Sequence, residues 1–216
     1  PKSAHKLFYE LGINDIDGLK IALKEEKVRT IRGFGPKKEE KLLKSVNEYK
    51  EYSGLMLLSE AEGKAQEVIE TLEEKDKEDI IDMLKLAGSI RRKKELIGDI
   101  DILVATDKPS ETVDLITKLR FIEDIIDKGN KKVSIMTEEK VRIDFRIINS
   151  ENMATALQYF TGSQSHNVKI RKLARKHNYK LNEYGLFKLK DKEENKLKID
   201  CEEQIYNKLG LDYIIP

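Results

Sequence analysis

The sequence predicts an α+β protein in which three regions follow one another. Apolar residues recur at helical spacing through residues 1–50. Apolar and polar residues alternate with a period of two at residues 99–104 and 141–148, which indicates strands of a sheet. The last part of the chain combines short helical and extended segments. We therefore expect a helical region, then a mixed, largely antiparallel sheet flanked by helices, and finally a small α/β region.

The composition is that of a globular protein without a dominant charge. Of 216 residues, 39% are apolar and 38% are charged, and the net charge is only +1. Contacts with nucleic acid must therefore come from local clusters of basic residues. The single cysteine, Cys201, excludes an internal disulfide, and we expect it to be half-buried near a helix start. The longest uncharged apolar run, residues 53–59, is too short to span a membrane, so a soluble intracellular protein is expected.

Two copies of the frame Pro-Lys-x-x-x-Lys-Leu occur in the first region, at residues 1–7 and 36–42. Only the second copy is preceded by a Gly-x-Gly segment, formed by Gly33 and Gly35. Glycine amides ahead of a helix N-terminus can bind a DNA phosphate without reading the bases. Gly33, Gly35 and Lys37 are thus candidate DNA-binding residues, with plain helix packing as the alternative. Because the first copy lacks its glycines, we expect the chain to be part of a longer protein.

The helices and strands that follow are predicted from the same patterns. Short turns are expected at Gly12 and Gly18, and Ser59 and Glu62 have the spacing of a capping box at the start of a long helix. The apolar face of that helix should cover a sheet. A strand is expected at residues 83–87, a helix at 109–119, and strand-like runs at 121–126, 132–136 and 141–148.

Residues 88–104 carry the most specific pattern in the chain. Apolar residues at positions 100, 102 and 104 alternate with Asp99 and Asp101, so the two carboxylates share one face of a strand. Such a pair repels itself unless a cation lies between its members, which suits Mg²⁺. Upstream, the backbone at Gly88 and the Ser89 hydroxyl can bind a polyphosphate. Arg91 and Arg92 are expected to neutralise its charge.

Two-metal phosphoryl transfer requires a further ligand. Asp144 lies in the strand predicted at residues 141–148 and has Arg142 and Arg146 on the same face. The antiparallel meander formed by the preceding strands should bring Asp144 into the sheet that holds Asp99 and Asp101. Taken alone, Asp144 is equally compatible with a solvated charge at a sheet edge.

The last region is expected to begin with a helix capped by Asn149 or Ser150, which breaks at residues 159–163. A second helix, residues 166–177, contains a cluster of cations without an acid, which favours a phosphate partner, although a solvated basic face is the alternative. Extended runs are expected at residues 179–189 and 196–199, and a small helix at 202–209. The basic residues of the cluster are Lys169, Arg171, Lys172, Arg175 and Lys176.

These motifs together resemble a known family. Gly88-Ser89, the Asp-x-Asp pair and the distant Asp144 resemble the palm of the nucleotidyltransferase superfamily. The Gly-x-Gly hairpin and a carboxy-terminal motif narrow the resemblance to the family X DNA polymerases, the polymerase beta-like repair enzymes. It implies fingers with helix-hairpin-helix repeats at residues 1–52, a nucleotidyltransferase palm at 53–148 and a thumb at 149–216. The carboxy-terminal motif consists of Tyr159, Phe160, Thr161, Gly162, Ser163, Asn167, Arg171, Asn182, Glu183 and Tyr184.

The resemblance also implies a role for each motif residue. Asp99, Asp101 and Asp144 would be the catalytic residues and the ligands of two Mg²⁺ ions, or of Mn²⁺ in their place. The residues expected to bind the nucleotide are Gly88, Ser89, Arg92, Gly98, Tyr159, Phe160, Gly162 and Asn167. Those expected to bind DNA are Gly33, Gly35, Lys37, Arg146, Arg171, Glu183 and Tyr184.

The function that this resemblance implies is DNA-directed DNA synthesis of the repair or gap-filling type. The expected partners are gapped or primer–template DNA and deoxynucleoside triphosphates, without membrane contact, for a monomer in the cytoplasm or nucleoid of a prokaryotic cell. The enzymatic alternative is a template-independent nucleotidyltransferase acting on RNA or a small molecule. The non-enzymatic alternative is a DNA-binding module with an inactive palm. We expect the family's lyase and metal-dependent phosphoesterase domains to be absent from this chain.

Overall fold

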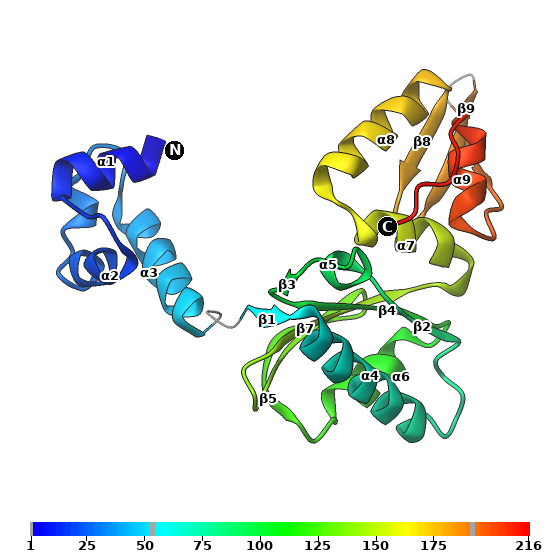
Figure 1. Cartoon of the computed structure of the whole chain (residues 1–216), viewed down its shortest axis with the longest axis horizontal. Coiled ribbons are helices and arrows are strands. Elements are labelled where there is room, and N and C mark those ends of the chain that lie inside the picture. The colour runs from blue at the N-terminus through cyan, green and yellow to red at the C-terminus, as the bar shows by residue number, and fades with distance from the viewer. Residues whose placement is uncertain (1, 52–54, 191–192) are drawn as a thin grey trace. The chain divides into compact units, whose positions relative to one another are not determined.

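The computed structural model describes residues 2–51, 55–190 and 193–216 (Figure 1). The chain divides into two compact units, residues 1–54 and 55–216. The described residues of the first unit form helices and turns, whereas the second unit combines helices with three sheets. The predicted α+β class is therefore confirmed. Within the described ranges, no helix is both long and apolar enough to cross a bilayer.

In the first unit, helices α1, α2 and α3 and a short 3₁₀ turn surround a small apolar core. α1 spans Lys2–Leu11, α2 Ile16–Lys24, η1 Val28–Thr30 and α3 Pro36–Glu51. The core consists of Leu7, Ala22, Leu23, Val28, Ile31, Phe34 and Val46.

Turns were predicted at two glycines of the first unit, and only one of them forms a turn. Gly12 has a φ of +65° and follows the end of α1, as predicted. Gly18 was predicted to form a turn, but it lies inside α2, and its amide donates to the Asp15 carboxylate at 2.6 Å. The prediction at Gly18 is wrong because the Asp15 side chain caps the helix and starts it before the glycine.

A buried acid joins the 3₁₀ turn to α3. The Glu39 carboxylate accepts a hydrogen bond from the backbone amide of Arg29 at 2.9 Å and pairs with the Arg29 guanidinium. Glu39 is only 2% exposed. Burial raises the pKa of Glu39, but the contacts with Arg29 outweigh it, and the pKa lies below its ordinary value.

The second unit contains a five-stranded sheet in the order β2-β4-β7-β6-β5. β4 and β7 run parallel, and the other neighbouring strands run antiparallel, so the sheet is mixed as predicted. A separate two-stranded ribbon pairs β1 with β3. The elements are β1 Met56–Leu57, α4 Leu58–Lys75, β2 Met83–Leu86, α5 Gly88–Arg91, β3 Leu96–Ile97, β4 Ile100–Ala105, α6 Pro109–Thr117, β5 Ile122–Gly129, β6 Lys132–Thr137 and β7 Arg142–Ile148.

Helices cover both faces of the inner strand β4. Ile102 and Val104 are buried together with apolar residues of α4 and α6, so α4 covers the sheet as its pattern predicted. Leu103, on the opposite face, is buried with Ala87 and with Ala156 of the later helix α7 (Met153–Thr161). Figure 1 shows α4 and α6 on one side of the sheet and α5 and α7 on the other. The carboxylate face of β4 is therefore partly covered, which places charged groups close to apolar surroundings.

The capping box predicted at Ser59 and Glu62 is wrong. α4 begins at Leu58, with Leu57 at the N-cap position, and no side chain caps this end among the described residues. Leu57 is held in register with Leu96 of β3, so the chain turns into the helix directly from a strand. This pairing places Ser59 inside the first turn, where its side chain cannot act as an N-cap.

The carboxy-terminal part adds a three-stranded antiparallel sheet in the order β10-β9-β8. The run predicted at residues 179–189 is a hairpin of two strands, and the run predicted at 196–199 is a strand that begins and ends earlier. Cys201 is exposed rather than half-buried and occupies the N-cap position of α9. The elements are η2 Ser150–Asn152, α7, α8 Gln164–Lys176, β8 Tyr179–Asn182, β9 Gly185–Lys190, β10 Glu193–Leu197 and α9 Glu202–Lys208.

Candidate active site

The pairing of β4 with β7 brings distant carboxylates together. Asp101 and Asp144 are direct partners in the parallel register, so their side chains project from the same face of the sheet. Asp99 lies two residues before Asp101, just ahead of the start of β4. The predicted position of Asp144 in the sheet of Asp99 and Asp101 agrees with this register.

The three carboxylates have different electrostatic surroundings. Burial, followed by the charges of Asp99 and Asp144, raises the pKa of Asp101 to about 7. Burial and the charge of Asp144 also raise the pKa of Asp99. Burial opposes the ionisation of Asp144, but its contacts with Arg142 and Lys132 outweigh burial, and its pKa is lowered. Of the three carboxylates, only Asp144 thus has contacts with cations that outweigh its burial.

Asp144 is 4% exposed and is surrounded by cations. Arg142 Nε lies 2.9 Å from one carboxylate oxygen, and Lys132 Nζ and Arg146 Nη2 lie 3.1 Å and 3.7 Å from the other. In this arrangement, no three acidic, histidine or cysteine side chains of the described residues are gathered closely enough to hold a metal ion. The donor set, three carboxylates on one sheet face, nevertheless fits a hard divalent cation in type and backbone position.

Gly88 makes the closest approach to the carboxylates. It begins α5 with a φ of +57°, and a Cβ atom at this position would lie 2.0 Å from Asp101 Oδ2. A side chain at residue 88 would therefore displace Asp101. Gly98, by contrast, has open surroundings, because a Cβ there would make only an ordinary contact with Leu55 at 3.5 Å. Gly98 does not line the cavity described next.

A cavity of about 500 Å³ lies between the five-stranded sheet and α8. It contains Asp99 and Asp101 and seven of the eight residues predicted to bind the nucleotide, all except Gly98, and it also reaches Arg171. Asp144 does not line it. The lining residues are Gly88, Ser89, Arg92, Asp99, Asp101, Tyr159, Phe160, Gly162, Ser163, Gln164, Asn167, Val168 and Arg171.

The turn between α7 and α8 is held in a defined arrangement. The rings of Tyr159 and Phe160 meet edge to face at 5.1 Å. The Asn167 side-chain amide donates to the Tyr159 carbonyl at 2.6 Å and accepts from Gln158 at 3.0 Å. Gly162 has a φ of +71° in this turn, and such a backbone conformation favours glycine. The aromatic pair and Asn167 therefore form one fixed wall of the cavity.

The sequence did not predict a contact network that joins Arg91 and Arg92 to Thr161 and Glu202. Arg91 does not line the cavity. Its Nη1 donates to Thr161 Oγ1 at 2.6 Å, and its two terminal nitrogens pair with both oxygens of Glu202 at 2.9 Å and 2.5 Å. The neighbouring Arg92 donates to the Thr161 carbonyl. The Arg91 guanidinium is thus paired with Glu202, and its expected contact with a bound phosphate stays a prediction.

The predicted DNA-binding residues fall into separate places. Gly33, with a φ of +95°, and Gly35 form the turn before α3, whose first turn contains the exposed Lys37. The sequence analysis did not single out Lys38, which donates to the Gly33 carbonyl at 3.1 Å and lies 4.0 Å from the centre of the Phe34 ring.

The remaining predicted DNA-binding residues lie in the second unit. Arg146 lies beside Asp144 and stacks 5.0 Å from the centre of the Phe160 ring. Glu183 and Tyr184 form the turn between β8 and β9, where Lys131 lies 5.0 Å from the centre of the Tyr184 ring. Arg146, Glu183 and Tyr184 do not line the cavity.

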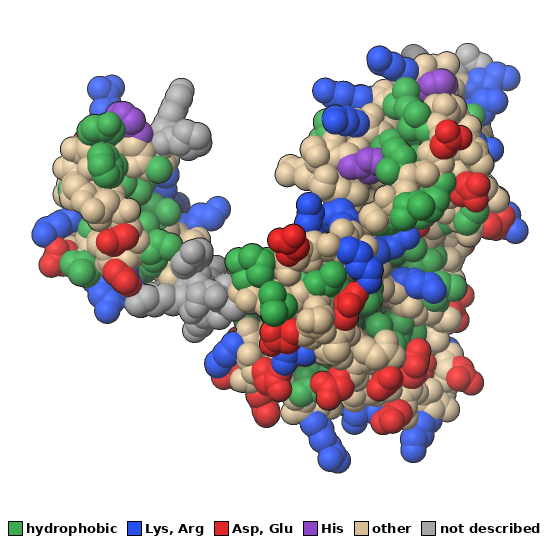
Figure 2. All heavy atoms as spheres, viewed as in Figure 1, with side chains coloured by type: hydrophobic (Ala, Val, Ile, Leu, Met, Phe, Trp, Pro, Cys, Tyr) green, Lys and Arg blue, Asp and Glu red, His purple; other side chains and the backbone are tan. Residues whose placement is uncertain are grey.

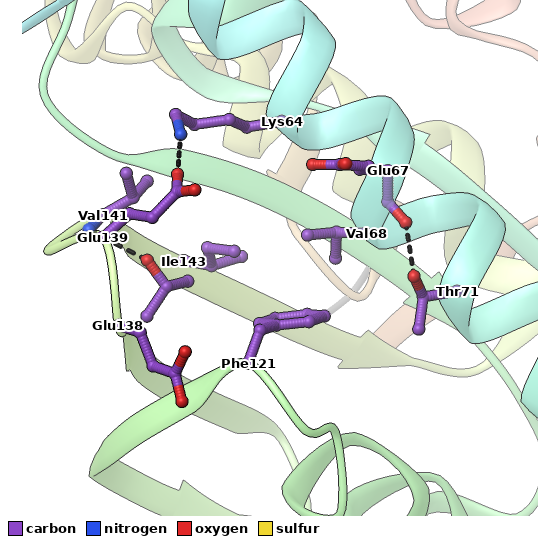
Figure 3. A pocket seen from close by; sticks show the side chains of 10 residues that line it. Lys64, Glu67, Val68, Thr71, Phe121, Glu138, Glu139, Val141 and Ile143 are labelled. Carbon is purple, nitrogen blue, oxygen red and sulfur yellow. Dashed lines mark hydrogen bonds and ion pairs between the residues drawn. The ribbon is translucent and has the colours of Figure 1, made fainter.

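A second cavity, of about 320 Å³, lies between α4 and the turn that joins β6 to β7 (Figure 3). Val68, Phe121 and Ile143 form its apolar part, and Lys64 pairs with Glu139 at its edge. It contains none of the predicted site residues. Lys64 balances only one of the three acidic residues that line this cavity, Glu67, Glu138 and Glu139.

Comparison with known proteins identifies the family. The DNA polymerase beta thumb family matches residues 156–216. The chain is 32% identical over 135 residues to the repair DNA polymerase X of African swine fever virus (isolate Warthog/Namibia/Wart80/1980), a match that covers 60% of this chain and 76% of the viral protein. The chain belongs to the family X DNA polymerases. The matched thumb segment lies within the thumb predicted at residues 149–216.

Two further comparisons extend this result. The chain is 34% identical over 220 residues to the DNA polymerase/3'-5' exonuclease PolX of Bacillus subtilis (strain 168), which covers all of this chain and 37% of the Bacillus protein. The chain thus spans about a third of that relative. Polymerase beta of Leishmania infantum in a ternary P/T complex shares the fold with a TM-score of 0.70 at 22% identity, covering 100% of this chain and 92% of that one.

Proposed function

We propose that this family X chain is a DNA-directed DNA polymerase of the repair or gap-filling type. The 3′-hydroxyl of a primer attacks the α-phosphate of a deoxynucleoside triphosphate, and pyrophosphate leaves. One observation supports this proposal above the others: a single cavity is lined by Asp99 and Asp101, by Arg92 and by the Tyr159–Asn167 wall. Carboxylates for metal, a cation for phosphate and a shaped wall for the sugar and base are thus within reach of one nucleotide.

The residues that would hold two divalent ions, Mg²⁺ or Mn²⁺, are Asp99, Asp101 and Asp144. When bound, such ions neutralise charge on the phosphates and lower the pKa of the primer hydroxyl. The pKa of Asp101, raised to about 7 by burial and then by the charges of Asp99 and Asp144, supports this assignment, because a bound cation would offset both effects. Asp144 would have to leave its contact with Arg142 to join the other two.

The chain's own residues would position the triphosphate and the nascent base pair. Ser89 and Arg92 would bind the β- and γ-phosphates, where charge develops as pyrophosphate leaves. Tyr159 and Phe160 would contact the sugar. Asn167 and Arg171 would face the minor-groove edge of the nascent pair, whose acceptors are similar in all correct pairs. This arrangement favours complementary nucleotides without selecting a template sequence.

Incorporation on a one-nucleotide gap tests the proposal. Each template base should direct its complementary deoxynucleotide, in the presence of Mg²⁺ and on gaps with or without a 5′-phosphate. Asp101→Ala should abolish incorporation, whereas Asp124→Ala, an exposed acid on β5, should leave it unchanged. Extension of single-stranded RNA without template direction would instead support the template-independent alternative and overturn the proposal.

A further inference from the structure

The exposed side of α8 carries a row of five cations, of which the proposed function uses only Arg171. All five basic residues of this row are exposed. Figure 2 shows Lys and Arg side chains gathered over α8, whereas acidic side chains are frequent on the visible face of the palm. The row consists of Lys169, Arg171, Lys172, Arg175 and Lys176.

The charges of this row are not balanced by the chain. None of the five appears in an ion pair with another described residue, whereas Lys180 and Lys196 of the adjacent thumb sheet pair with Glu194 and Glu151. Like charges at i and i+4, such as Arg171 with Arg175, destabilise a helix. The helix dipole favours cations in the last turn only, and so accounts for Arg175 and Lys176 but not for the others. A ligand with negative charge would relieve this repulsion.

The row begins at the nucleotide cavity. Gln164, Val168 and Arg171 line the cavity and follow one another at helical spacing, and Lys172 and Arg175 continue the same stripe. From Arg171 to Arg175 the helix rises about 6 Å. The stripe therefore leads away from the cavity along a single helix. Its width suits one strand of nucleic acid rather than two.

We propose that Lys172, Arg175 and Lys176 bind backbone phosphates of the template strand on the 5′ side of the templating base. This inference rests on the proposed polymerase function. The primer ends at the cavity, so the template is the strand that continues beyond it without interruption. The exposed positions of the row carry no aromatic side chain, so the contacts are electrostatic and independent of base sequence.

Equilibrium binding to primer–template DNA with template overhangs of different length tests this assignment. Fluorescence anisotropy of a labelled duplex is measured with a short and with a long single-stranded overhang, over a series of salt concentrations. The wild-type chain should bind the long overhang about tenfold more tightly and with a steeper salt dependence. The variant K172Q/R175Q/K176Q should lose this difference. The matched control K77Q/K118Q/R120Q, which removes the same charge from exposed palm positions, should keep it.

Three outcomes overturn the inference. The first is that K172Q/R175Q/K176Q still binds the long overhang more tightly than the short one. The second is that the control variant loses this difference to the same extent. The third is an advantage that requires a double-stranded extension, because the row would then bind downstream duplex instead. Thermal unfolding of both variants confirms that they fold.

Failure of the proposed polymerase function gives a different result. In that case the wild-type chain incorporates no nucleotide on the short-overhang duplex. Failure of the present inference leaves that incorporation intact and removes only the dependence of binding on overhang length.

Discussion

The palm and the thumb hold their parts of the cavity by different means. In the palm, backbone pairing between β4 and β7 fixes Asp101 opposite Asp144. In the thumb, the wall of the cavity is connected to the palm through side chains, above all Arg91 with Glu202. Register cannot change without breaking a sheet, whereas a side-chain contact can break and form again within a folded chain. Strand pairing thus fixes the backbone positions of Asp101 and Asp144, whereas the contacts that hold the thumb wall can break without unfolding the chain.

Removing a palm carboxylate should have the largest effect. Asp144→Asn keeps the size of the side chain but removes the charge, and we expect the incorporation rate on a one-nucleotide gap to fall by about 10³- to 10⁵-fold. Single-turnover kinetics measures this rate. Asp124→Asn serves as a control on an exposed strand. A loss smaller than tenfold would show that Asp144 is not part of the metal site.

The second largest effect is expected from disturbing the palm without removing a charge. Gly88→Ala forces a Cβ atom against Asp101 and requires an unfavourable backbone angle, so we expect a loss of about 1–3 kcal/mol in stability and about 100-fold in rate. Gly63→Ala in α4 is the control, because a Cβ there meets nothing within 4 Å. Equal behaviour of the two variants in denaturant unfolding and in gap filling would contradict the close contact at Gly88.

Breaking the contact between palm and thumb should have a smaller effect on rate. Glu202→Gln weakens the pairing with Arg91, and we expect the KM for the nucleotide to rise about tenfold with a smaller change in kcat, because the carboxylates stay in place. Glu203→Gln, on the same first turn of α9 but exposed, is the matched control. If kcat fell and KM stayed constant, the contact would act on the chemical step instead of on nucleotide positioning.

The smallest effect on activity is expected in the first unit, none of whose described residues lines the cavity. Glu39→Gln should cost about 1–2 kcal/mol of stability by weakening the contact with Arg29, and Glu40→Gln should cost little. Since the folded-state pKa of Glu39 is lowered, its contribution is present above the ordinary glutamate pKa and is lost as the pH falls through the folded-state value. Hydrogen exchange of the α3 amides at a series of pH values measures this contribution to stability. Equal acid sensitivity of wild type and Glu39→Gln would contradict the assignment.

Sequence patterns predicted the elements that carry the site but not every contact between them. The alternation around Asp99, Asp101 and Asp144 predicted their strands, because side-chain direction alternates along a strand. The pairing of Arg91 with Glu202 joins residues 111 positions apart and leaves no periodic signal. The conformation in which Arg142 and Lys132 neutralise Asp144 likewise depends on side-chain rotamers.

Local signals failed where a neighbouring element decided the outcome. The strand pairing of Leu57 prevents the capping box expected at Ser59. The Asp15 cap places Gly18 inside a helix instead of in the expected turn. In both cases the helix started before the predicted residue. Short-range patterns therefore identified which elements exist more reliably than where each begins.

Binding of Mn²⁺ tests the central claim, that Asp99, Asp101 and Asp144 share one divalent-metal site, most directly. Electron paramagnetic resonance counts the bound ions in a complex with primer–template DNA, a dideoxy-terminated primer and a non-hydrolysable deoxynucleotide analogue. We expect two Mn²⁺ ions in the wild-type chain and at most one in Asp144→Asn. Two ions in both proteins would contradict the claim.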